Sequence, residues 1–200
     1  MTMTLAETVD SFRSEVVAAA ATIVRRRRAL RANRALLVAV SGIDVTGDEQ
    51  VAQAVVERLR AQGLRAERLS VDSAERTSGR LALDAIVGRA LLPLRETRSV
   101  RLPAVASAPM VEFDDIDVLV VDGALLLRRE LRALFDLSIW VECSFATAQE
   151  RSPTWASSVD ALAAWARQKE HLRRDEPRLH ADLVIVHDPR LQAPAWSEVG

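Results

Sequence analysis

Residues 35–49 read Ala35-Leu-Leu-Val-Ala-Val-Ser-Gly-Ile-Asp-Val-Thr-Gly-Asp-Glu49. The first six are a continuous apolar run, which is typical of a parallel strand that is covered on both faces. A helix is predicted downstream, because apolar residues recur on one helical face up to Leu59 and Gly63 then provides a C-cap. The loop between them holds two glycines, Gly42 and Gly47. This stretch therefore predicts a strand, a glycine loop and a helix, the opening of an α/β unit.

Strand-like and helix-like segments alternate along the rest of the chain. Further strands are expected at 64–71, 118–121, 137–143 and 181–186, and further helices at 5–31, 81–92, 127–134 and 159–174. The helix at 81–92 is expected to stop at Pro93, and 96–109 to be loop or edge structure. This alternation predicts an α/β fold with a doubly wound, mainly parallel five-stranded sheet and an N-terminal helix. We divide the chain into an N-terminal helical extension, 1–34, and one α/β domain, 35–200.

Composition gives little support for a macromolecular or membrane partner. Opposite charges nearly balance, with 27 Lys and Arg against 28 Asp and Glu, so we expect no nucleic-acid and no membrane partner. Cys143 is the only cysteine, so no intrachain disulfide can form, and a reducing, cytoplasmic location is expected. These features are compatible with either a monomer or a homodimer.

The glycine loop matches part of a phosphate-binding motif. A Walker A loop has the pattern GxxxxGK[ST] between a strand and a helix, and both glycines match it in spacing. The lysine position is Asp48 and the Ser/Thr position is Glu49. In the motif, the lysine lies against the terminal phosphates and the hydroxyl binds magnesium, so Asp48 reverses the sign of the first interaction. The alternative for this loop is a tight strand-to-helix turn with acidic residues at the helix N-terminus.

Several landmarks, taken in order, resemble the uridine kinase family of P-loop kinases (phosphoribulokinase/uridine kinase). They are Val38–Asp44 at the loop, Leu69–Ser73 and Leu119–Gly123 at strand ends, Arg129–Ile139, and Ala181–Val186 followed by Asp188-Pro189. The resemblance covers roughly residues 35–190 and rests on order and spacing, since no single motif is specific. It implies the P-loop kinase fold and ATP-dependent phosphorylation of a nucleoside 5′-hydroxyl, with a small-molecule nucleoside or nucleotide as partner.

The resemblance also implies roles for particular residues. Asp72 matches the catalytic base that accepts the hydroxyl proton, and Asp122 matches the acidic residue that positions Mg²⁺. Without the resemblance, Asp72 is a strand-end cap and Asp122 part of an Asp-Gly turn. The ATP phosphates would lie against Gly42, Ile43, Asp44, Val45, Thr46, Gly47, Asp48 and Glu49, with Arg151 as a clamp from the lid.

Departures from the family pattern give two hypotheses. Val45 replaces a loop glycine, and Ala74 and Glu75 replace an aromatic pair, in addition to the changes at the motif's lysine and hydroxyl positions. The first hypothesis is a nucleoside kinase whose activity is weak or lost. The second is a pseudokinase, in which the fold persists as a binding or regulatory module. His187 is expected to be a strand-end residue, and the three histidines are too scattered to predict a metal site.

Overall fold

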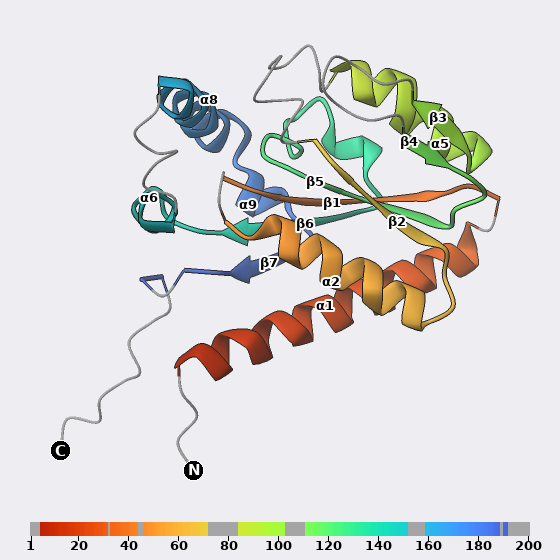
Figure 1. The fold of residues 1–200 in the computed structure, drawn as a ribbon, viewed down its shortest axis with the longest axis horizontal. Coiled ribbons are helices and arrows are strands. Elements are labelled where there is room, and N and C mark those ends of the chain that lie inside the picture. Colours follow the sequence, from red (N-terminus) through yellow and green to blue (C-terminus); the bar gives the residue numbers. More distant parts are fainter. Residues whose placement is uncertain are drawn as a thin grey trace.

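A computed structural model of the chain describes residues 5–31, 33–43, 46–71, 84–102, 111–151, 159–188 and 190–191. Its centre is a five-stranded sheet in the order β2-β5-β1-β6-β7 (Figure 1). The strands are β1 (Leu36–Gly42), β2 (Ala66–Ser70), β5 (Val118–Asp122), β6 (Leu137–Glu142) and β7 (Leu183–Val186). All four neighbouring pairs are parallel, which confirms the predicted doubly wound sheet.

The central strand β1 lies where the winding direction changes. From β1 the chain runs through α2 (Asp48–Ala61) to β2 at one edge of the sheet, whereas from β6 it runs to β7 at the other edge. In open parallel sheets, ligands bind beyond the carboxyl ends of the strands at this switch point. The loop after β1 therefore occupies the position at which a ligand site is expected.

Helices cover both faces of the sheet (Figure 1). On one face, α1 (Leu5–Leu30) and α2 pack on alternate residues of β1, including Leu36, Val38 and Val40. The opposite core contains residues of η1 (Val87–Leu91), α5 (Leu92–Thr97), α6 (Phe145–Arg151) and α8 (Val159–Asp175). Burial on both faces explains why β1 reads as a continuous apolar run. Within the described residues, no helix is both long and apolar enough to cross a bilayer.

Two local predictions are wrong. The helix predicted to stop at Pro93 continues through α5 to Thr97, because η1 is a π-helical turn in which the Leu92 N–H bonds the Val87 carbonyl five residues back. This change of register places Pro93 in the first turn of α5, where its missing N–H costs nothing. The helix predicted at 127–134 is reduced to the 3₁₀ turn η2 (Arg132–Leu134), after a turn in which Leu125 has φ 49°. Within the predicted range the main chain forms i→i−3 bonds, such as Leu131 N–H to the Arg128 carbonyl and Leu134 N–H to the Leu131 carbonyl, which are typical of 3₁₀ turns.

Three short elements complete the described part of the chain. The predicted loop or edge segment after α5 contributes β3 (Val100–Leu102), which pairs antiparallel with β4 (Val111–Phe113) outside the main sheet. The single turn α9 (Pro177–His180) precedes β7.

Candidate functional site

At both glycines of the loop after β1, neighbouring atoms lie too close to leave room for a side chain. A Cβ built on Gly42 would lie 2.9 Å from the Val141 carbonyl oxygen and 2.9 Å from Thr46 Cγ2. Gly47 has φ 91°, and a Cβ there would lie 2.7 Å from two atoms of the His187 ring. The space beside each glycine is therefore filled by other groups of this chain. Asp44 and Val45 lie outside the described residues.

The Thr46 carbonyl is held by two side chains from elsewhere in the fold. Arg151, at the end of α6, donates from Nη1 to this carbonyl at 3.1 Å and from Nη2 to the His187 carbonyl at 2.7 Å. His187, just beyond β7, also contacts the Thr46 carbonyl through Nδ1. The structure thus places Arg151 beside the glycine loop, as the resemblance implies. In addition to the two carbonyls, its Nη1 lies 3.6 Å from Cys143 Sγ and 3.5 Å from His187 Nδ1.

The acidic pair opens α2. Asp48 is buried, and its Oδ1 accepts a hydrogen bond of 3.3 Å from Thr46 Oγ1, whereas Glu49 is exposed. Carboxylates in the first turn of a helix are stabilised by the helix dipole. Two carboxylates therefore lie at this helix end, where a phosphate would bind.

Asp122 is fully buried at the end of β5 and forms a two-point ion pair with Arg68. Arg68 donates from Nε to Oδ1 at 2.6 Å and from Nη2 to Oδ2 at 2.9 Å. Its third nitrogen, Nη1, reaches Glu49 Oε1 at 3.1 Å. The hydrogen bonds to Asp122 raise the pKa of Arg68 above its ordinary value, although partial burial acts in the opposite direction. The Arg68 guanidinium therefore bridges Asp122, the residue expected to position Mg²⁺, and Glu49, which stands at the Ser/Thr position of the motif.

Asp188 fixes the segment that carries His187. Its carboxylate accepts hydrogen bonds from the Ser144 N–H at 2.7 Å, Thr147 Oγ1 at 2.8 Å and the Arg190 N–H at 2.8 Å. Burial by itself raises the pKa of Asp188, but these hydrogen bonds outweigh it and lower the pKa to about 2. The carboxylate stays ionised and ties the end of β7 to the start of α6.

Sequence reasoning missed Arg68 and assigned His187 no contact with the loop. The sequence shows only a cation two residues before the end of a predicted strand. That this cation shares a sheet face with Asp122 follows from the pairing of β2 with β5, which the structure supplies. Asp72, the expected base, lies outside the described residues. Within the described part of the chain, no three His, Cys, Asp or Glu side chains form a metal-ligand cluster.

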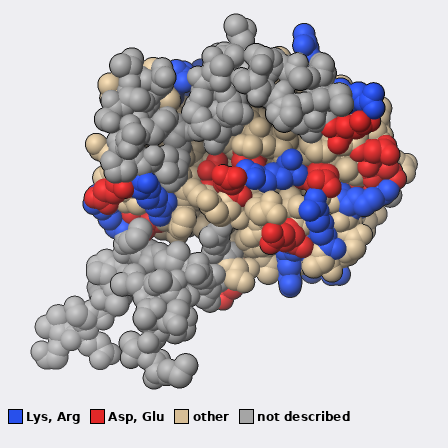
Figure 2. Space-filling view, in the orientation of Figure 1, with Lys and Arg blue, Asp and Glu red and all other residues tan. Residues whose placement is uncertain are grey.

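Charged side chains of both signs are interleaved on the face of the molecule shown in Figure 2. Described charges of opposite sign also form ion pairs between neighbouring elements, such as Arg60 with Glu67. The described surface on this side consequently offers no broad area of a single sign.

No protein-family model and no curated protein matches the sequence. Solved structures do match the fold. A possible uridine kinase from Bacillus stearothermophilus aligns with a TM-score of 0.55 and 18% identity, over 76% of this chain and 89% of that one. A candidate fructose transport system kinase from Silicibacter sp. TM1040 aligns with a TM-score of 0.51 and 22% identity, over 84% of this chain and 98% of that one. The chain thus has a uridine kinase-like P-loop kinase fold.

Proposed function

We propose that this chain is a pseudokinase: a nucleoside-kinase-like fold that does not transfer phosphate from Mg-ATP and persists as a binding or regulatory module. The observation that carries the proposal is the guanidinium of Arg68, which bridges Asp122 and Glu49. The kinase-like neighbours support nucleotide and Mg²⁺ binding as the ancestral use of this site.

A magnesium ion does not fit the residues as they are arranged. In P-loop proteins the Walker A hydroxyl and an acidic residue at a neighbouring strand end hold Mg²⁺. Here both oxygens of Asp122 accept hydrogen bonds from Arg68, which is itself a cation. A buried Mg²⁺ beside that guanidinium would meet like-charge repulsion of several kcal/mol at about 4 Å. Arg68 supplies the positive charge that the carboxylate needs, so the metal is not required for stability.

The position at which a phosphate would bind is also unfavourable. Asp48 is an anion where the motif has a cation, and a phosphate a few ångströms away would be repelled by roughly 4 kcal/mol at an effective dielectric constant of 20. The helix dipole would return only about 0.3–1 kcal/mol. The His187 ring against Gly47 and the Arg151 bond to Thr46 further restrict the described ends of the loop.

Calorimetric titration with Mg-ATP tests the proposal. The parent chain is compared with Asp48→Lys/Glu49→Ser and with the same pair combined with Arg68→Gln. A charge control, Asp48→Asn/Glu49→Gln, removes the repulsion without restoring the lysine or the hydroxyl. We expect no saturable heat from the parent, and binding in the triple variant that exceeds binding in the charge control.

A second measurement tests the nucleoside kinase hypothesis directly. The parent chain is incubated with Mg-ATP and a panel of nucleosides, and ADP formation is followed. Micromolar Mg-ATP affinity of the parent, or nucleoside-dependent ADP formation, would overturn the pseudokinase proposal and favour an enzyme of nucleoside 5′-hydroxyls. Circular dichroism spectra of all variants establish that a silent variant is folded.

A further inference from the structure

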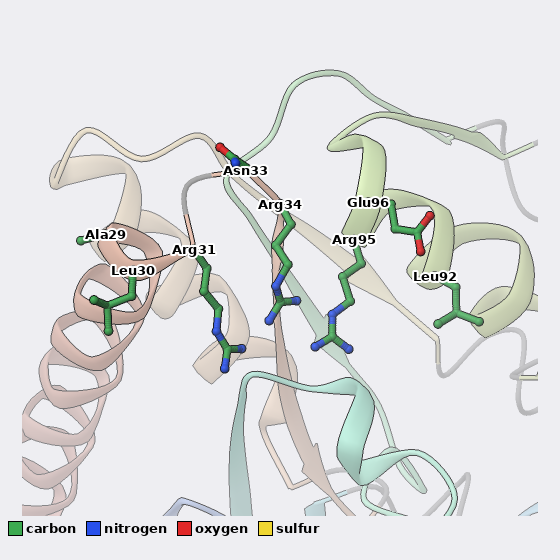
Figure 3. A pocket seen from close by; sticks show the side chains of 8 residues that line it. All are labelled: Ala29, Leu30, Arg31, Asn33, Arg34, Leu92, Arg95 and Glu96. Carbon is green, nitrogen blue, oxygen red and sulfur yellow. The ribbon is translucent and has the colours of Figure 1, made fainter.

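The amino ends of the strands, opposite the glycine loop, carry a cluster of arginines beside a hollow of about 900 Å³. Its lining includes Arg31 at the end of α1, Arg34 just before β1 and Arg95 on α5 (Figure 3). The three side chains extend in the same direction with their guanidinium groups side by side, whereas Glu96 turns away from them (Figure 3). Residues from two helices and one strand entry thus place three cations in one wall.

Among the described residues, Asp136 is the carboxylate that contacts all three arginines. Arg34 alone neutralises it, because both terminal nitrogens of Arg34 bond the two oxygens of Asp136. Arg31 adds a bond of 2.6 Å from Nη1, and Arg95 approaches only to 3.8 Å. Asp136 also accepts the Leu37 N–H at 3.0 Å and is buried, so its oxygens are fully used. Three arginines against Asp136 and Glu96, the carboxylates described at this hollow, leave a net positive charge.

More positive charge is present than is needed to neutralise Asp136. The C-terminal end of α1 offsets part of it, since the helix dipole contributes about half a negative charge there. Arg31 is nonetheless half exposed, at 50%, and each guanidinium has five N–H donors, of which Asp136 takes only one or two. Arg95 also donates from Nη1 to the Leu134 carbonyl at 3.2 Å. The other donors of Arg31 and Arg95 are those that an anion in the hollow would engage. Planar guanidinium groups are well suited to bind phosphate oxygens in pairs.

Apolar side chains flank the cations. Leu30 is 86% exposed and Leu92 is 49% exposed, and they lie on either side of the arginines in Figure 3. Leucines this exposed, beside a cationic wall in a hollow of ligand size, match a ligand that has an anionic head and an apolar body.

We propose that this hollow binds a small phosphate monoester with an apolar or aromatic organic part. A phosphate monoester is close to a dianion at neutral pH, so its charge has the sign that the positive lining favours. Arg31 and Arg95 bind the phosphate oxygens, Arg34 adds its positive charge while it holds Asp136, and Leu30 and Leu92 contact the organic part. The site lies at the opposite end of the sheet from the glycine loop and does not depend on the proposed pseudokinase function.

Calorimetric titration of the full chain with phenyl phosphate, phenyl sulfate and inorganic phosphate at pH 7.5 tests the site. Phenyl sulfate has nearly the same shape and one negative charge fewer, so we expect it to bind about tenfold more weakly than phenyl phosphate. Arg95→Gln should weaken phenyl phosphate by about tenfold, through the loss of one charge-assisted contact. Leu92→Ala should weaken phenyl phosphate and leave inorganic phosphate unchanged.

Three control variants locate the binding. Arg101→Gln removes an exposed arginine outside the hollow, and Leu179→Ala removes an exposed leucine elsewhere; both should bind as the parent does. Arg151→Gln alters the glycine loop and should also leave phenyl phosphate binding unchanged. Absence of saturable phenyl phosphate binding by the parent would overturn the proposal. So would equal affinity for phenyl sulfate, loss of binding in Arg151→Gln, or unchanged affinity in a folded Arg95→Gln variant.

Discussion

Replacement of Arg68 by methionine should destabilise the protein strongly. The substitution keeps the apolar stem and removes a guanidinium that donates two hydrogen bonds to the fully buried Asp122. Loss of one partner from a buried ion pair costs about 3–5 kcal/mol, because the remaining charge is left uncompensated. The contact to Glu49, whose side chain is 65% exposed, adds little. For a chain of this size, the expected fall in Tm is roughly 6–20 °C.

Urea unfolding followed by far-UV circular dichroism measures the change. The double variant Arg68→Met/Asp122→Asn should recover most of the lost stability, since no buried charge remains unpaired. The matched control is Arg60→Met, which breaks a half-exposed pair with Glu67 and should cost no more than about 1 kcal/mol. The reasoning is refuted if Arg68→Met costs no more than this control.

The effect of Mg²⁺ on the stability of Arg68→Met is a second, independent test. With the guanidinium gone, Asp122 and Glu49 are left without their shared cation, and Mg²⁺ should bind there. At a tenfold excess over its Kd, the ion would stabilise Arg68→Met by about 1.4 kcal/mol and leave the parent unchanged. Sodium chloride of equal ionic strength is the control. An equal effect of Mg²⁺ on both proteins would show that Arg68 does not take the place of the metal.

Three further outcomes follow from the geometry around the loop. Asp188 has a pKa of about 2 in the folded protein, below the ordinary 3.8, so its carboxylate contributes fully to the free energy of unfolding above pH 3.8. That contribution is lost as the pH falls through 2. Urea titrations at pH 7 and pH 2 should therefore show that Asp188→Asn loses about 2 kcal/mol less stability on acidification than the parent. Gly47→Ala should lower the free energy of unfolding by about 1–3 kcal/mol, which is more than Gly63→Ala. Both glycines have positive φ, but only a Cβ at Gly47 would clash with the His187 ring. Equal falls in Tm for the two variants would argue against that contact. Cys143 is buried, which raises the pKa of its thiol, so a thiol reagent should react slowly with the native chain and fully in urea; rapid native labelling would contradict its burial.

The sheet could be predicted because its pattern is local. β1, β5 and β6 are covered on both faces, and strands in that situation read as short apolar runs bounded by polar residues or glycine. Helix boundaries were less predictable where a tertiary or backbone detail intervened. Pro93 ends a regular α-helix, but a π-helical turn just before it removes the conflict. The segment 127–134 has apolar residues at helical spacing, but its main chain forms i→i−3 turns.

Some features of the candidate site could be predicted from the sequence, and others could not. The spacing of Gly42 and Gly47 and the acidic replacements Asp48 and Glu49 are legible in the chain, as is the charge reversal that they bring. The pairing of Arg68 with Asp122 joins residues 54 positions apart, and that of His187 with Thr46 joins residues 141 apart. Neither follows from local spacing, because each depends on which strands become neighbours and on the direction in which their ends point.

The sequence by itself thus determined the parallel α/β fold and the acidic residues at the motif's lysine and hydroxyl positions, since strand and helix periodicity and residue charge are properties of short stretches. Only the tertiary structure decided what fills the altered site and where surplus charge collects. It placed Arg68 between Asp122 and Glu49, and it gathered Arg31, Arg34 and Arg95 around Asp136. Electrostatic interactions act through space over a few ångströms, so residues far apart in the chain become partners only once the sheet order is fixed.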